Sequence, residues 1–340
     1  MPDRVLLTGI SGYVGGHTAL ALLDAGYIVR GSVRSLDKAE KVRAGLAKAG
    51  AAIERLEFVR LDLTEDEGWT EAMAGCRYLL HTASPFVTRM PKDRMELVGP
   101  AIAGTRRAVE AALAADIERV VLTSSMAAMV YGHDAKRTAP FTEADWTRLD
   151  GRDINAYVES KTRAEREAWD VMEKAGRSAD LAVINPSAIV GPLLDDDPGT
   201  SVALMIRLMN GSVPAAPRMG FVLVDVRDVA AAHLAAMIAP SAGGHRFPLG
   251  DKSMALIDIA NTLRAHFPER AGKLPRLVLP DWLVHLYGLF DSDLRGNLGE
   301  LGIVKQLDSS AIIALLGRPP IPAETSLIDT VDSLIAEHLI

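Results

Sequence analysis

The sequence has a single cysteine, few aromatic residues and no long uncharged apolar run. Because Cys76 stands alone, no internal disulfide can form, and no cysteine/histidine cluster has zinc spacing. A chain without disulfides suits a reducing cytosol. No window reaches eighteen uncharged apolar residues, and the N-terminal run in MPDRVLLTG is too short for a signal-peptide core. These absences predict a cytoplasmic protein that holds no metal and does not enter a membrane.

An excess of positive charge is also missing. The 37 Lys and Arg are outnumbered by 44 Asp and Glu, which gives a net charge of −7 at neutral pH. Binding to nucleic acid or to an anionic membrane needs clustered excess Lys and Arg, so neither is expected as a partner. An anionic ligand would need a local basic pocket.

Short β-branched runs do alternate with longer helical patterns over the first 125 residues. Continuous apolar strands separated by helices are typical of a parallel sheet covered on both faces. The pattern predicts an α/β fold built on a doubly wound parallel sheet, a Rossmann fold. The expected strands are residues 4–9, 27–34, 56–63, 77–84 and 118–125, and the expected helices include 37–49, 65–74 and 96–115.

The alternation becomes less regular after residue 180. Residues 180–192 have the pattern of a sixth strand that leaves the sheet, and 221–237 that of a strand followed by a helix. We expect a smaller, discontinuous C-terminal lobe that binds the substrate, and no motif is recognised after residue 250. The expected Rossmann domain is 1–186 plus about 215–250, and the expected substrate lobe is about 187–214 plus 251–340.

Residues 8–16 read TGISGYVGG, at the point where the first strand gives way to a helix. Gly9 permits a tight turn, Gly12 lets the main chain approach a pyrophosphate, and Gly15 allows close packing of helix on strand. The N–H groups of the helix N-terminus then face the phosphates. The alternative is a glycine-rich turn that binds nothing. The residues expected to contact the cofactor here are Thr8, Gly9, Ser11, Gly12, Tyr13, Val14 and Gly15.

Three polar side chains are expected to meet near this turn. Ser124 or Ser125 ends the strand at 118–125, on the carboxyl edge where such sheets bind ligands. Tyr157 and Lys161 project from one face of the next helix, four positions apart in NAYVESK. A YxxxK pair on its own is usually a surface contact, so the motif gains meaning only beside the glycine turn and the serine.

The chemistry of these groups suits proton transfer to a carbonyl. A phenol with its ordinary pKa near 10 donates a proton slowly at neutral pH, and a nearby positive charge makes it more acidic. Tyr157 would then be the general acid in reduction and the general base in oxidation. A serine would polarise the carbonyl by a positioned hydrogen bond.

The GxxGxxG spacing after a threonine resembles the extended branch of the short-chain dehydrogenase/reductase superfamily. The dihydroflavonol 4-reductase-like group is especially similar, since VRS, LDL, HTASP, TSS, YVESKTRAE, INPSAIVGP and VDVRDVAAAH follow the turn in order, up to residue 233. This group includes flavonoid reductases, cinnamoyl-CoA reductases and microbial aldehyde and ketone reductases. The resemblance implies NADPH-dependent reduction of a ketone or aldehyde, with Ser125, Tyr157 and Lys161 as the catalytic residues.

The cofactor preference depends on the end of the second strand. Arg34 stands where an acidic residue would hold a ribose 2′-hydroxyl, so NADP(H) is expected. Its planar donors match a 2′-phosphate, and Lys41 would add a point charge. Alternatively, Arg34 is a solvated residue and either cofactor binds. The resemblance implies further cofactor contacts at Asp62, which alternatively caps a helix, and at Leu63, Thr82, Ala83, Ser84, Pro186, Ser187 and Ser201. Tyr157 and Lys161 are also expected to contact the cofactor, with the Lys161 ammonium on the nicotinamide ribose.

The expected partner is a small carbonyl compound, hydrophobic or aromatic, bound by a monomer or homodimer. Val130 stands where plant flavonoid reductases have a polar residue, which argues against polyhydroxylated flavonoids. A nucleotide-sugar epimerase or dehydratase with bound NAD shares the serine, tyrosine and lysine, but commonly has an acidic residue in place of Arg34. A non-catalytic cofactor sensor would be expected to lack the tyrosine or lysine. The apolar residues that suggest the substrate pocket, or else plain core, are Phe86, Met126, Val130, Leu204 and Met205.

Overall fold

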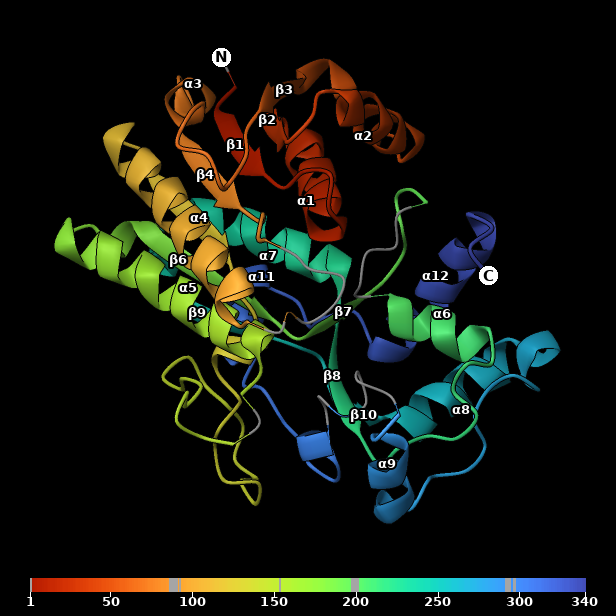
Figure 1. The fold of residues 1–340 in the computed structure, drawn as a ribbon. Helices are drawn as coiled ribbons and strands as arrows, with labels where there is room; N and C mark the ends of the chain where they lie inside the picture. The colour runs from red at the N-terminus through yellow and green to blue at the C-terminus, as the bar shows by residue number, and fades with distance from the viewer. Residues whose placement is uncertain are drawn as a thin grey trace.

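A computed structural model describes residues 2–85, 91, 93–152, 154–196, 202–290, 295 and 298–340. Within these residues a seven-stranded parallel sheet forms the centre of the molecule, in the order β3-β2-β1-β4-β5-β6-β9 (Figure 1). The order reverses between β1 and β4, so the doubly wound α/β fold is confirmed. The strands are β1 (Arg4–Thr8), β2 (Ile28–Val33), β3 (Leu56–Arg60), β4 (Tyr78–His81), β5 (Arg119–Thr123), β6 (Leu181–Pro186) and β9 (Arg246–Leu249).

Helices cover both faces of the sheet, because successive side chains of a strand point to opposite sides. On β1, Leu6 packs in a core with α3, α4 and α5, whereas Val5 and Leu7 pack in a second core with α1, α2, α7 and α11. These helices are α1 (Tyr13–Asp24), α2 (Asp37–Lys48), α3 (Trp69–Met73), α4 (Met95–Ala114), α5 (Ala156–Lys174), α7 (Val226–Ile238) and α11 (Ser310–Leu316).

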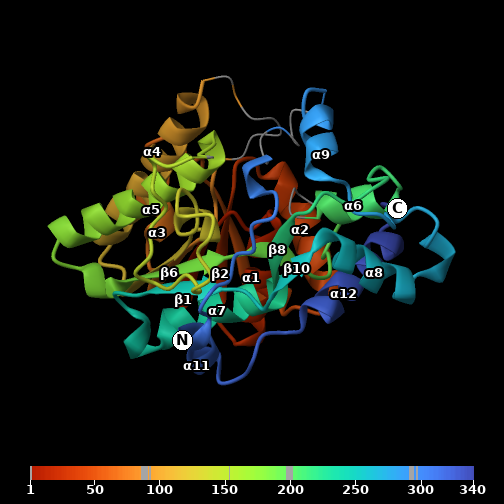
Figure 2. The ribbon, with the colours of Figure 1, turned by 90° about the horizontal axis from the view of Figure 1, so that it is seen from below.

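A smaller lobe has a sheet and a core of its own, and Figure 2 shows its helices gathered on the side away from α3, α4 and α5. Its strands pair in the order β10-β8-β7. The expected strand at 180–192 is two strands, since the chain leaves the large sheet after β6 and β7 pairs with β8. The elements are β7 (Ala188–Val190), β8 (Gly220–Asp225), β10 (Ser253–Ala255), α6 (Ala203–Met209), α8 (Leu256–His266), α9 (Asp281–Tyr287) and α12 (Ala323–Ala336).

The chain passes between the lobes more than once. β8 belongs to the small sheet, whereas α7 packs on β5 and β6 and β9 joins the large sheet beside β6. The boundaries of the two lobes stay a prediction. Among the described residues, no helix combines the length and the apolar composition needed to span a bilayer.

Two expected elements are shorter than their sequence patterns. The helix expected at 65–74 begins only at Trp69, because Asp62 folds into a turn and Gly68 has a left-handed φ of 86°. The strand expected at 77–84 ends at His81. The residues that follow His81 contact the glycine turn instead of extending the strand.

Candidate active site

The glycine turn links β1 to α1 in a conformation that excludes side chains. Gly9 has φ 74°, and its carbonyl accepts a hydrogen bond of 2.9 Å from the Gly12 N–H. A Cβ on Gly15 would lie 2.0 Å from the Gly9 oxygen, so helix and turn can meet only at a glycine. α1 has no side-chain cap and no acidic residue in its first turn, so the N–H groups of Tyr13 and Val14 suit a pyrophosphate.

The end of β4 supports this turn. The Thr82 hydroxyl donates to the Thr8 carbonyl at 2.7 Å, and the Ala83 N–H donates to Thr8 Oγ1 at 3.3 Å. Thr8 Oγ1 also lies 2.8 Å from His81 Nδ1. Burial, and after it the charge of Lys161, lowers the pKa of His81 to about 4, so this imidazole is neutral at neutral pH. His81 is a buried strand residue, and the Lys161 ammonium is close enough to influence its pKa.

The two serines after β5 have different partners. Ser124 Oγ donates to Glu165 Oε2 at 2.5 Å, and both groups are buried. Ser125 Oγ accepts a hydrogen bond of 3.1 Å from the Ala127 N–H, which begins the short helix η2 (Met126–Ala128). Ser124 therefore donates its proton inside the protein, whereas no described residue accepts the proton of the Ser125 hydroxyl.

The tyrosine and the lysine lie in the first two turns of α5. The Asn155 side chain caps this helix by accepting a hydrogen bond of 2.9 Å from the Val158 N–H. Tyr157 is 36% exposed, and Lys161 Nζ lies 5.9 Å from the centre of its ring. The ammonium and the phenol are therefore neighbours at the carboxyl edge of the sheet.

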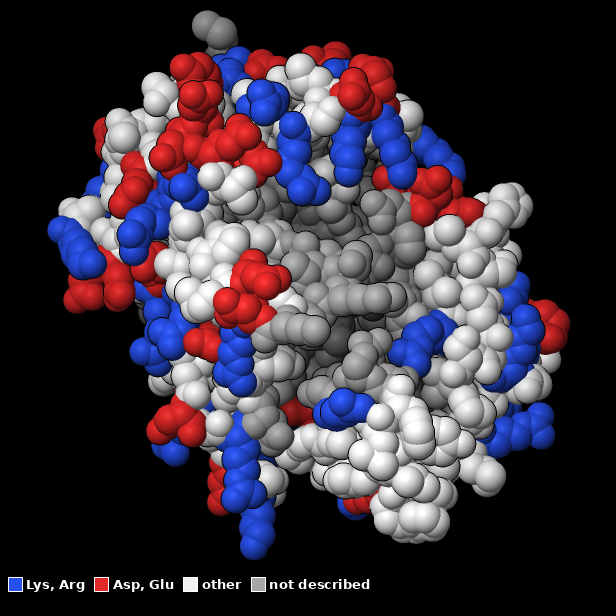
Figure 3. Space-filling view, in the orientation of Figure 1, with Lys and Arg blue, Asp and Glu red and all other residues white. Residues whose placement is uncertain are grey.

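Basic residues lie beside the glycine turn in spite of the negative net charge. Arg34 is exposed directly after β2, and Figure 3 shows Lys and Arg side chains over the region of α2. Arg34 is among the charges that hold the pKa of the Asp62 carboxyl below its usual range, after the hydrogen bonds from Thr64. Lys41 forms an ion pair of 2.5 Å with Asp196, so it bridges α2 to the chain beyond β7.

The remaining expected cofactor contacts occupy several strand ends. Asp62 is not the N-cap of α3, because Gly68 holds that position and Asp62 accepts hydrogen bonds from Thr64. Ser187 is buried after β6, and its N–H donates to the Leu249 carbonyl at 2.9 Å. Leu63 and Ser84 are half-buried after β3 and β4, and Pro186 is the buried end of β6. The expected contacts Ser201 and Phe86 lie outside the described residues.

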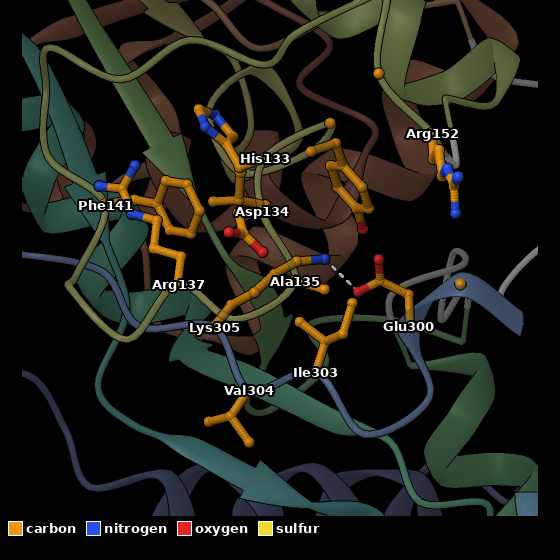
Figure 4. Close-up of a pocket in the computed structure, with 15 residues that line it drawn as sticks. His133, Asp134, Ala135, Arg137, Phe141, Arg152, Glu300, Ile303, Val304 and Lys305 are labelled. Atoms are coloured by element: carbon orange, nitrogen blue, oxygen red, sulfur yellow. Dashed lines mark hydrogen bonds and ion pairs between the residues drawn. The ribbon is translucent and has the colours of Figure 1, made fainter.

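A cavity of about 400 Å³ opens beside Tyr131, between the chain after η2 and the segment around η6 (Leu298–Glu300) (Figure 4). Tyr131 lines it, and burial raises the pKa of this phenol, with smaller contributions from Glu300 and Tyr157. Lys305 pairs with Glu300 and lies 3.8 Å from the centre of the Tyr131 ring. No sequence pattern indicated Glu300 or Lys305, because both follow the last recognisable motif.

The expected apolar pocket residues are divided between this cavity and the core. Val130 lines the cavity, and Met126 packs in the cluster that contains Val130. Leu204 and Met205 lie on α6 in the core of the small lobe. Leu204 and Met205 are therefore core residues, which was the alternative expectation for them.

Comparison with known proteins identifies the family. A model described as the NAD dependent epimerase/dehydratase family matches residues 5–250. Cinnamoyl-CoA reductase CAD2 of Medicago truncatula is 35% identical over 270 residues, which cover 78% of this chain and 81% of that protein. The chain therefore belongs to this family, within the extended short-chain dehydrogenases/reductases that its motifs resemble.

Two further relatives match over almost the whole chain. The ketoreductase azaE of Aspergillus niger is 32% identical over 323 residues, which cover 88% of this chain and 93% of that protein. The crystal structure of yeast methylglyoxal/isovaleraldehyde reductase Gre2 complexed with NADPH has 25% identity and a TM-score of 0.80, and covers 99% of this chain and 100% of that chain. Both lobes of the chain therefore have counterparts among reductases.

Proposed function

We propose that the protein is a carbonyl reductase, which converts a ketone or aldehyde into an alcohol with NADPH. One observation carries the proposal. One edge of the sheet holds the uncapped glycine turn together with the side chains of Ser125, Tyr157 and Lys161, and the Ser125 hydroxyl has a proton to donate. The names of the relatives agree, since they include a cinnamoyl-CoA reductase, a ketoreductase and an NADPH-bound aldehyde reductase.

NADPH, when bound, supplies the hydride that the carbonyl carbon receives. Ser125 donates a hydrogen bond to the carbonyl oxygen and so stabilises the negative charge that develops there. Tyr157 then delivers its proton to that oxygen, which completes the alcohol. The positive charge of Lys161 favours the phenolate that Tyr157 leaves behind and thereby assists the transfer.

The chain's own residues divide the binding of the cofactor and substrate. The N–H groups of the glycine turn hold the pyrophosphate, and Arg34 holds the 2′-phosphate of NADPH. The small lobe and the cavity beside Tyr131 receive the part of the substrate that does not react. Arg34 also separates this proposal from a nucleotide-sugar epimerase, which commonly has an acidic residue at that position.

An assay of NADPH consumption over a panel of aromatic and aliphatic ketones and aldehydes tests the proposal. At least one compound should be reduced, and Tyr157→Phe should lower kcat by about 10²- to 10⁴-fold while the Kd for NADPH is unchanged. Tyr287→Phe is the matched control, because Tyr287 is an exposed residue of α9 and should retain full activity.

Two results would contradict this function. The first is the absence of turnover with every carbonyl of the panel. The second is a Tyr157→Phe enzyme that is as fast as the wild type, which would remove the tyrosine from the chemistry. Tightly bound NAD in the purified protein would support an epimerase or dehydratase instead.

A further inference from the structure

A buried ion pair lies directly behind the two serines. It joins Glu165 of α5 to Arg246 of β9, with 1% and 6% of these residues exposed. The Arg246 guanidinium lies 3.7 Å from the centre of the Trp146 ring and donates to the Glu143 and Asp145 carbonyls. No sequence motif contains Arg246, but Glu165 follows Lys161 by four positions along the helix that carries Tyr157.

The Glu165 carboxylate is shared among three donors that belong to, or directly follow, three neighbouring strands. Oε1 accepts from Arg246 Nε, whereas Oε2 accepts from Ser124 Oγ at 2.5 Å and from Asn185 Nδ2 at 2.7 Å. Asn185 Nδ2 also lies 3.3 Å from the Ser125 carbonyl and donates to it. One carboxylate therefore connects α5 to the end of β5, to β6 and to the start of β9.

These contacts fix the orientation of Ser125 from two sides. Ser124, the residue before it, donates a hydrogen bond from its hydroxyl to Glu165, and the Ser125 carbonyl accepts one from Asn185. Its Oγ accepts a hydrogen bond from the Ala127 N–H, and no described residue accepts the proton of this hydroxyl. Because Glu165 is on the helix that carries Tyr157, the same carboxylate also sets the separation between the serine and the tyrosine.

Stability alone is a weak explanation for this ion pair. Taking both charges out of water opposes their attraction, and apolar residues of the same volume often serve a fold equally well. Fixed geometry is a better explanation, since a misplacement of about 1 Å at a reacting group can reduce a rate by about 10²-fold.

We propose that Glu165 is a positioning residue for carbonyl reduction, acting through Ser124 and Asn185 on Ser125. This inference rests on the proposed function of the site. Glu165 has no contact with the substrate in this role, so its removal should affect kcat more than the binding of NADPH.

The first experiment measures kcat, KM and the Kd for NADPH of Glu165→Gln and Ser124→Ala. Both variants should lose kcat, by about 10- to 100-fold for Glu165→Gln, with the Kd for NADPH within about twofold of wild type. Thr123→Val is the matched control, because Thr123 is the preceding residue on β5 and its hydroxyl pairs with His233 on the other face. This variant should stay within about twofold of the wild-type kcat.

A double-mutant cycle separates positioning from a general loss of structure, and it remains available if Glu165→Gln does not fold. In a Ser125→Ala background, Ser124→Ala should change kcat less than about twofold, because the group that it orients is already absent. An equal loss of kcat in both backgrounds, or an equal loss for Thr123→Val, would overturn the proposal.

Crystal structures of wild type, Ser124→Ala and Thr123→Val give a readout that does not need activity. The distance from Ser125 Oγ to the Tyr157 hydroxyl should change in Ser124→Ala and stay unchanged in Thr123→Val. An unchanged distance together with an unchanged kcat overturns the positioning role. A wild type that reduces no carbonyl would reject the proposed function and, with it, a role of Glu165 in carbonyl reduction, whereas a displaced Ser125 in Ser124→Ala would still show that this network orients Ser125.

Discussion

At the scale of single residues, the two adjacent serines differ because their hydrogen-bond partners differ. Either Ser124 or Ser125 fits the pattern of a serine at a strand end. Ser124 donates its proton to a buried carboxylate, whereas Ser125 receives a main-chain N–H and retains a proton to donate. Both serines are buried, so identical side chains differ in chemistry because their hydrogen-bond partners differ.

Arg34 carries the prediction of cofactor choice. Arg34→Asp should lower the preference for NADPH over NADH by about 10- to 100-fold, because a charge-assisted hydrogen bond is replaced by repulsion of the 2′-phosphate. The measurement is kcat/KM with each cofactor. Arg276→Asp makes the same change of net charge at an exposed residue of the small lobe and should keep the preference. If Arg34→Asp leaves the preference for NADPH over NADH unchanged, another group must recognise the 2′-phosphate.

At the scale of elements, α5 carries the largest share of the candidate site. Tyr157, Lys161 and Glu165 follow one another at intervals of four along it, so one helix presents a proton donor, a cation and a buried carboxylate. Its first turn depends on the Asn155 cap. The position of the tyrosine therefore depends on how well the helix begins.

Removing this cap should affect both stability and activity. Asn155→Ala should lower the free energy of unfolding by about 1 kcal/mol and reduce kcat, because the first turn frays around Tyr157. Asn155→Ser keeps a capping oxygen and should restore most of both. Urea unfolding and steady-state kinetics provide the measurements. If the alanine and serine variants behave alike, the cap has no influence on the tyrosine.

At the scale of the whole molecule, two buried histidines link folding to pH. His81 and His233 are 1% and 0% exposed, and burial is the largest cause that lowers the pKa of each to about 4. His233 receives the hydroxyl of Thr123 on one nitrogen and donates to the Val229 carbonyl with the other. Both imidazoles therefore stay neutral in the folded protein at a pH where the unfolded chain takes up protons.

The free energy of unfolding should fall as the pH drops from 6.5 to about 4. In this window the unfolded state binds more protons than the folded state, so acid favours unfolding, and the full contribution is present above pH 6.5. The loss amounts to at most about 3 kcal/mol for each histidine. Urea unfolding at several pH values measures it. His233→Gln should flatten the slope, whereas His266→Gln, at an exposed position, should leave it unchanged.

The sequence by itself determined what depends on neighbours along the chain. The glycine turn, the strand ends and the four-residue interval between Tyr157 and Lys161 are local patterns, and the alternation of strands and helices predicted the doubly wound sheet. Asp62 as a possible helix cap and the longer helix at 65–74 were wrong, because Gly68 and the turn at Asp62 interrupt that segment.

Only the tertiary structure decided which distant residues meet. The choice between Ser124 and Ser125 depends on Glu165, and Glu165 depends on Asn185 and Arg246 from strands 20 and 81 positions further along the chain. The cavity beside Tyr131 likewise needs Glu300 and Lys305, which carry no motif. Contacts between such separate segments leave no periodicity or spacing in the sequence, because they arise only when the strands and helices pack.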